Sequence, residues 1–203
     1  MDKILEIKDL HVHYYSNRRT VRAVNNLSLD MQRGRVLGLV GETGAGKTTL
    51  ALSILNMISA PQGKIISGSI RFDNTDILGM SNQELRELRG KDIAMIFQDP
   101  MTALNPVLTI GEQIAETIFK HEKVSKAEAW SKAEEMLETV GIPGVRAREY
   151  PHQFSGGMKQ RVVIALSLAC NPRLLLADEP TTALDVTIQA QVLDLMRGLI
   201  RTN

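Results

Sequence analysis

A glycine-rich segment constrains the fold of this chain more than any other part of its sequence. The segment consists of Gly41, Glu42, Thr43, Gly44, Ala45, Gly46, Lys47 and Thr48. It follows the apolar run 35–40, which has the length of a buried strand, and leads into the helical pattern of residues 47–58. Glycines let backbone N–H groups turn inward around an anion, and a helix start adds partial positive charge. The order of strand, loop and helix therefore predicts a phosphate-binding loop.

Side chains at the end of this segment have distinct expected roles. Lys47 is expected to reach the β- and γ-phosphates of a nucleotide, and Thr48 is expected to offer its hydroxyl to Mg²⁺. We count the neighbouring Thr49 among the residues that contact the nucleotide. A lysine taken alone is more often a solvated surface residue, so the functional interpretation of Lys47 depends on the loop around it.

A second apolar run ends in two adjacent carboxylates. Residues 173–177 have the pattern of a strand, and Asp178 and Glu179 follow directly. Because neighbouring side chains of a strand point in different directions, the two carboxylates are expected to act separately. Asp178 would hold the coordination shell of Mg²⁺, and Glu179 would orient or deprotonate an attacking water molecule. The alternative is an ordinary exposed strand end.

A serine and two glycines precede a third helical pattern. Ser155, Gly156 and Gly157 open a helix that extends to Ala169. A serine cap followed by glycines exposes backbone N–H groups at a helix start, which is a second anion-binding surface. The simpler alternative is a helix cap without a ligand.

Composition excludes several classes of protein. The 24 Lys and Arg residues nearly cancel the 23 Asp and Glu residues, so no nucleic-acid partner is expected. The single cysteine, Cys170, can form neither an internal disulfide nor a thiolate metal site alone. The longest apolar stretch, residues 162–170, is about half as long as a membrane-spanning helix must be.

The remaining sequence alternates between strand and helix patterns. Strands are expected over 4–14, 23–31, 35–40, 67–77, 93–97 and 174–176. Helices are expected over 47–58, 81–88, 109–140, 155–169 and 186–200. These patterns predict one α/β domain over 1–203 with a P-loop NTPase core of parallel strands. An antiparallel β subdomain would precede the core, and a helical subdomain would be inserted at 101–160.

The segment from Phe154 to Met158 resembles the signature sequence of ABC ATPases. This chain departs from the usual Leu-Ser-Gly-Gly-Gln form at both ends of the segment, with Phe154 and Met158. Longer stretches, at 95–106, 150–158 and 177–185, resemble the ATP-binding subunits of oligopeptide, dipeptide and nickel importers. Within that group they resemble the first of two different ATPase subunits, and Met158 is then no longer unusual.

The resemblance implies roles for three further residues. Gln98 is similar to the Q-loop glutamine, which senses Mg²⁺ and transmits its state to membrane subunits. Asp185 is similar to the aspartate of the D-loop, which couples two ATP sites. Tyr14 resembles the aromatic residue that stacks on adenine, with Tyr15 as the alternative. A half-buried strand aromatic is the competing interpretation of Tyr14.

The resemblance also implies cofactors, partners and a location. ATP and Mg²⁺ would bind between two chains, because in this family the signature of one subunit faces the γ-phosphate held by another. The implied partners are a second homologous ATPase, two membrane-spanning permease subunits and, indirectly, an extracytoplasmic solute-binding protein. The chain would lie peripherally at the cytoplasmic face of the cell membrane and hydrolyse ATP to power import of di- or oligopeptides.

Three alternatives to a peptide importer remain open. A nickel importer uses a similar ATPase. A soluble ABC ATPase acts on DNA or ribosomes, and such proteins usually carry paired domains, coiled coils or zinc cysteines that this sequence lacks. A regulatory module would bind ATP and dimerise without hydrolysing it.

The family also places a switch histidine on a strand beyond the last expected helix. All four histidines of this chain precede Asp178, and the sequence stops at Asn203. We therefore expect a C-terminally truncated chain whose turnover alone is far below that of a complete subunit.

Overall fold

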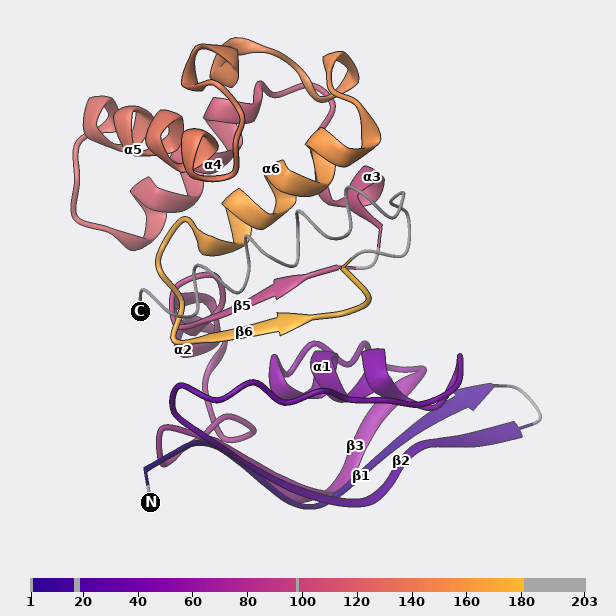
Figure 1. The fold of residues 1–203 in the computed structure, drawn as a ribbon. Coiled ribbons are helices and arrows are strands. Elements are labelled where there is room, and N and C mark those ends of the chain that lie inside the picture. Colours follow the sequence, from indigo (N-terminus) through magenta and orange to yellow (C-terminus); the bar gives the residue numbers. More distant parts are fainter. Residues whose placement is uncertain (1, 17–18, 98, 181–203) are drawn as a thin grey trace. The chain divides into compact units, whose positions relative to one another are not determined.

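The computed structural model describes residues 2–16, 19–97 and 99–180 (Figure 1). They form two compact units that divide after Arg86, and each is described by itself. The expected helix over 186–200 and the candidate site residues Gln98 and Asp185 lie outside the described residues. The prediction of a single domain with an insertion over 101–160 stays a prediction.

The first unit contains a four-stranded antiparallel sheet with the strand order β2-β1-β3-β4. Its strands are β1 (Lys3–Ser16), β2 (Arg19–Gln32), β3 (Gly63–Phe72) and β4 (Thr75–Asp76). Apolar side chains of the central strand β1, including Ile7, Leu10 and Val12, are fully buried. The expected antiparallel subdomain at the N-terminus is therefore confirmed.

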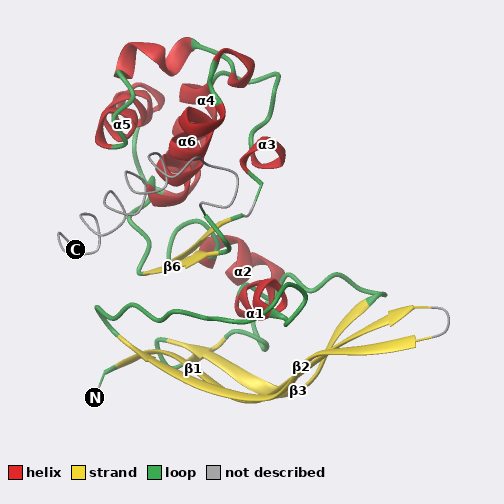
Figure 2. Ribbon diagram, turned by 45° about the vertical axis from the view of Figure 1, so that its right-hand side comes forward, coloured by secondary structure: helices red, strands yellow, loops and turns green. Residues whose placement is uncertain are grey.

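Helix α1 (Lys47–Ile54) lies along one face of this sheet (Figure 2). Its residues Leu50 and Ile54 are buried, which is the usual way an apolar helix stripe is stabilised. The helix is shorter than the predicted 47–58 because Asn56 adopts a left-handed backbone with φ 49°. Asparagine tolerates this conformation, and it commonly ends a helix.

The expected buried strand over Arg35–Val40 is wrong in this structure. Neither sheet of the described residues includes the segment, and Val36 and Val40 are 74% and 101% exposed. An apolar run shows which residues are suited to burial, but a strand forms only where a neighbouring edge accepts its backbone hydrogen bonds. Among the described residues of the first unit, no strand edge pairs with residues 35–40 in this structure.

The second unit contains a parallel pair of strands, β5 (Ile93–Ile96) and β6 (Leu174–Ala177). All four residues of β5 are buried, as expected for a parallel strand covered on both faces. The two predicted apolar strands are confirmed, and they pair in register from Ile93 opposite Leu174.

Several helices belong to the described part of the second unit (Figure 1). They are α3 (Pro100–Ala103), α4 (Ile110–His121), α5 (Lys126–Thr139), α6 (Gly156–Leu168) and the 3-10 helices η1 (Gly144–Arg148) and η2 (Pro151–Gln153). Helix α2 (Asn82–Leu88) spans the division between the units. Among the described residues, no helix has the length and apolarity needed to cross a membrane.

The predicted helix starts are capped as their sequences indicate. At α2, the Glu84 N–H donates to Ser81 Oγ at 3.3 Å, and the Ser81 N–H donates to the Glu84 carboxylate at 2.7 Å. At α4, Thr109 and Glu112 form the same reciprocal pair. Each box satisfies N–H groups that the first turn leaves without a partner within the helix.

The core of the second unit lies between α4, α5 and α6. Ile110, Ile114 and Ile118 line one face of α4 at helical spacing, and all three are buried. Leu137 of α5 and Ile164 of α6 belong to the same buried cluster. This buried cluster packs α4 and α5 against α6, the helix that begins at the serine-glycine segment.

We predict that Leu137→Ala lowers the free energy of unfolding of this unit by about 2–5 kcal/mol, because truncation leaves a cavity in a fully buried site. The matched control is Glu135→Ala, an exposed position on the same helix, which should change it by less than about 0.5 kcal/mol. Urea unfolding followed by circular dichroism measures both. Equal losses would show that α5 does not depend on this cluster.

Candidate functional site

The predicted phosphate loop connects residue 40 to α1 as an exposed turn. The Ala45 N–H donates to the Glu42 carbonyl at 3.0 Å, which closes the turn. Gly44 and Gly46 have φ of 83° and 91°, in the left-handed region that favours glycine. Gly46 is the N-cap of α1, so the loop ends directly at the positive end of the helix.

The closest approach in the loop is between Gly46 and strand β2. A Cβ atom built on Gly46 would lie 2.2 Å from the carbonyl oxygen of Ala23. A side chain cannot occupy that position without moving backbone. The loop therefore contacts the antiparallel sheet through bare backbone, and only glycine meets both the steric and the conformational requirement.

Lys47 folds back over the loop that precedes it. Its ammonium donates to the Gly41 carbonyl at 2.8 Å and to the Glu42 carbonyl at 3.2 Å. A cation is thus held over a glycine loop at a helix start, and this combination suits a phosphate group. Thr48 lies exposed in the first turn, and Thr49 beside it is half-buried.

Tyr14 and Tyr15 differ in burial. Tyr15 is 42% exposed, whereas the Tyr14 ring packs against Gly63, 2.8 Å from the position of a Cβ built there. Tyr14 pairs with Val21 of β2, the strand that contacts Gly46 through Ala23. Tyr14 is therefore a half-buried strand aromatic on the sheet that supports the loop, and its stacking on adenine stays a prediction.

Asp178 and Glu179 follow β6 as expected, but strand alternation does not set their directions. Strand β6 ends at Ala177, and Glu179 has a left-handed backbone with φ 47°. Asp178 is only 7% exposed, and its N–H donates to the Ile96 carbonyl of β5 at 3.0 Å. A turn of the chain, anchored on β5, therefore separates a buried carboxylate from a half-buried one.

The expected Mg²⁺ ligands Thr48, Asp178 and Gln98 come from different parts of the chain. No group of three or more His, Cys, Asp or Glu side chains suited to a metal occurs among the described residues. Thr48 belongs to the first unit, Asp178 to the second, and Gln98 lies outside the described residues. The role of all three toward Mg²⁺ stays a prediction.

Ser155 caps α6, which confirms the predicted helix start. Its hydroxyl accepts from the Met158 N–H at 3.4 Å. Gly156 and Ser155 are exposed, and a Cβ built on Gly156 would meet nothing within 4 Å. The first turn of α6 thus presents backbone to open space, as an anion-contacting helix start requires.

Gln160 is a residue of this site that sequence reasoning missed. It is 1% exposed, and its side-chain amide donates to the Pro180 carbonyl at 2.7 Å. This bond joins the serine-glycine helix to the segment that directly follows Glu179. A signal existed, because Gln160 stands four residues before the buried Ile164 and so on the same helix face.

A glycine loop under its lysine, a strand that ends in two carboxylates and an α/β architecture together define a phosphate-loop NTPase. The model of the family described as ABC transporter matches residues 24–182. The chain therefore belongs to the ABC transporter family of ATP-binding proteins.

The names of two curated relatives describe ATP-binding proteins of peptide transport. The dipeptide transport ATP-binding protein DppD of Bacillus subtilis (strain 168) is 49% identical over 99% of this chain and 61% of its own length. The oligopeptide transport ATP-binding protein OppD of Escherichia coli (strain K12) is 48% identical over 98% of this chain and 59% of its own. The chain thus spans about three fifths of the length of these relatives.

Solved ATP-binding cassettes share this fold. One was determined as a dimer in a post-hydrolysis state bound to ADP and Pi, and it matches with a TM-score of 0.86 at 29% identity. The match covers 97% of this chain and 82% of that one. The expected fold, an ABC ATPase with an antiparallel layer and a helical part, is confirmed.

We predict that Gly46→Ala weakens binding of a fluorescent ATP analogue at least tenfold, because the new methyl group displaces the loop from Ala23. Gly34→Ala is the strain-matched control, since Gly34 has φ of 66° but nothing within 4 Å of its Cβ position. It should lower stability by about 1–2 kcal/mol and leave affinity unchanged. Unaltered affinity in Gly46→Ala would disprove the close-approach argument.

Proposed function

We propose that this chain binds ATP with Mg²⁺ and hydrolyses it as a motor subunit of an ABC importer of di- or oligopeptides. The observation that carries the proposal is the ammonium of Lys47, held over the glycine loop at the start of α1. A fixed positive charge at the start of a helix stabilises the charge of a triphosphate, which is the main requirement of phosphoryl transfer.

Each part of the loop has a proposed task. Residues 41–47 surround the phosphates, Lys47 binds the β- and γ-phosphates, and Thr48 and Thr49 contact the nucleotide and its metal. Asp178 and Gln98 complete the metal coordination. Mg²⁺, when bound, neutralises charge on the phosphate oxygens. The burial of Asp178 and the hydrogen bond from its N–H to Ile96 support a fixed backbone position for that residue.

Glu179 is the proposed general base for the attacking water. It is half-buried and follows a sharp turn after Asp178, so the two neighbouring carboxylates have different surroundings. This separation supports one carboxylate for the metal and one for water. The reaction is transfer of the γ-phosphoryl group to water.

The serine-glycine start of α6 is proposed to act on ATP held by another subunit. Ser155 and Gly156 are exposed and Gly157 is half-buried at a helix N-terminus, which suits a phosphate arriving from outside the chain. The dimeric form of the solved cassette bound to ADP and Pi supports such a sandwich. Asp185 would couple the two sites, and Tyr14 would stack on adenine.

The names of the relatives support peptides as the transported solute. We infer a complex with a second, similar ATPase and two membrane-spanning permease subunits, served by an extracytoplasmic solute-binding protein. The chain would lie peripherally at the cytoplasmic face of the membrane. Motion of the helical subdomain over residues 101–160 and of Gln98 would carry closure and reopening to the permeases.

Lys47→Ala tests the proposal directly. We expect affinity for ATP to fall at least tenfold, because the cation over the loop is lost, while the fold is retained. Lys64→Ala, which removes an exposed lysine of β3, is the charge-matched control and should leave affinity unchanged. Isothermal titration calorimetry measures both variants. Wild-type affinity in Lys47→Ala would overturn the proposed function.

Glu179→Gln separates binding from hydrolysis. We expect ATP affinity within twofold of wild type and a fall in phosphate release of about 10²–10⁴-fold, the usual contribution of a general base. The complete subunit assembled with its partner ATPase and permeases is the sample, and Glu135→Gln is the control. A wild-type complex that binds ATP but releases no phosphate would favour the regulatory module instead.

A further inference from the structure

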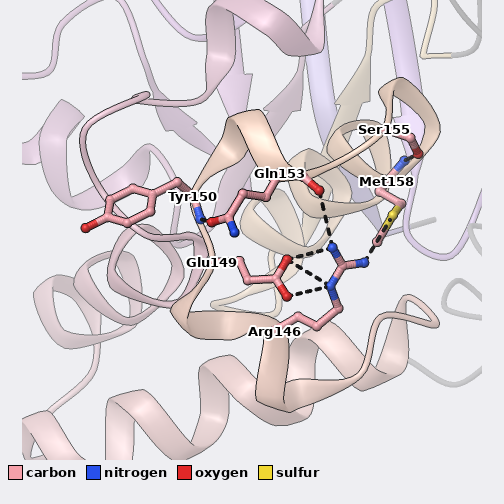
Figure 3. Close-up of polar contacts among 6 residues, drawn as sticks. All are labelled: Arg146, Glu149, Tyr150, Gln153, Ser155 and Met158. Atoms are coloured by element: carbon pink, nitrogen blue, oxygen red, sulfur yellow. Dashed lines mark hydrogen bonds and ion pairs between the residues drawn. The ribbon is translucent and has the colours of Figure 1, made fainter.

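Arg146 on η1 contacts several residues around the start of α6 (Figure 3). Its guanidinium forms a two-pronged ion pair with the Glu149 carboxylate, with N–O distances of 2.6–3.0 Å. It donates to the Gln153 carbonyl at 3.3 Å and to the sulfur of Met158 at 3.3 Å. It also lies 4.5 Å from the centroid of the Phe154 ring.

Two of these partners are the positions at which the chain departs from the usual signature. An aromatic ring at 154 attracts a cation over its face, which leucine does not do. A thioether at 158 accepts a weak hydrogen bond from the guanidinium. Both residues that depart from the usual signature therefore contact the same arginine.

The contacts of Arg146 bracket the serine-glycine turn. Gln153 and Phe154 come directly before Ser155, and Met158 donates its own N–H to the Ser155 hydroxyl. Gly156 and Gly157 have no side chains with which to hold themselves in place. The turn is thus held on both sides by one planar group, whose N–H donors point in fixed directions.

Glu149 keeps that planar group oriented. The hydrogen bonds from Arg146 lower the pKa of the Glu149 carboxyl, and the carboxylate in turn raises the pKa of Arg146. Both groups therefore remain charged at neutral pH. A two-pronged arginine–carboxylate pair constrains rotation of the guanidinium as well as its position.

We propose that Arg146 is a positioning residue that, through Phe154 and Met158, aligns the Ser155-Gly156-Gly157 helix start for its contact with nucleotide phosphate. The inference rests on the proposed function only for the identity of that anion. Arg146 itself does not touch the nucleotide. Phe154 and Met158 form, with Arg146, a set of three residues that work as a unit.

The first experiment compares Arg146→Ala, Arg146→Lys and the control Arg148→Ala in the assembled transporter. Arg148 is exposed on the same 3-10 helix, so its loss removes the same charge. We expect Arg146→Ala to lower kcat about tenfold, with the Kd for ATP of the isolated subunit within twofold of wild type. Arg146→Lys should stay near the alanine variant, because a lysine lacks the planar fork. Full activity in either Arg146 variant would overturn the proposal.

A double-mutant cycle tests whether Arg146 acts through its two partners. Phe154→Leu with Met158→Leu removes the aromatic ring and the thioether together, and Arg146→Ala is then measured with and without this pair. We expect the tenfold effect to shrink to less than threefold in the paired background. An equal effect of Arg146→Ala in both backgrounds would show that Arg146 does not act through Phe154 and Met158.

Amide hydrogen exchange in the isolated chain supplies a readout that does not depend on hydrolysis. The amides of Met158 and Lys159, which donate to the Ser155 hydroxyl and carbonyl, should exchange at least fivefold faster in Arg146→Ala, while those of α4 stay as in wild type. Met158→Leu, which removes only the thioether contact, is the milder variant if the alanine variant fails to fold. Unchanged exchange of the Met158 and Lys159 amides in the folded variants would refute the proposal. The proposed function fails independently, through Lys47→Ala.

Discussion

The contact between the Gly46 backbone and the Ala23 carbonyl of β2 is the constraint on which the first unit depends. It sets where the glycine loop meets α1, and so where the partial charge of that helix and the Lys47 ammonium are placed. A side chain at position 46 would overlap the Ala23 backbone, so only glycine lets the loop lie this close to β2. The antiparallel sheet thus supports the predicted anion site, and it contacts the glycine loop chiefly through backbone atoms.

In the second unit, α6 joins the elements that the proposed chemistry needs. Its start is the exposed serine-glycine turn, Gln160 donates to Pro180 beyond Glu179, and Ser167 donates to the Met95 carbonyl of β5. One rigid helix therefore connects the signature with the strand pair that carries Asp178.

Local patterns predicted elements well where the interactions are local. Capping at Ser81 and Ser155 depends on groups a few residues away, and β1 pairs along its length with β2, the next strand in the chain. The run 35–40 failed because burial of a strand depends on a partner distant in sequence. Gln160 was missed for the same reason, since it bonds to a carbonyl twenty residues away.

The sequence by itself determined the chemistry: which residues form the glycine loop, which carboxylates end an apolar strand, and which serine starts a helix. These follow from spacing along the chain, because phosphate loops and caps are built from neighbouring backbone groups. Only the tertiary structure decided that Gly46 meets Ala23, that a turn separates Glu179 from Asp178, and that Arg146 binds Phe154 and Met158. Those contacts join separate segments, and their energy comes from close packing that no single stretch of sequence encodes.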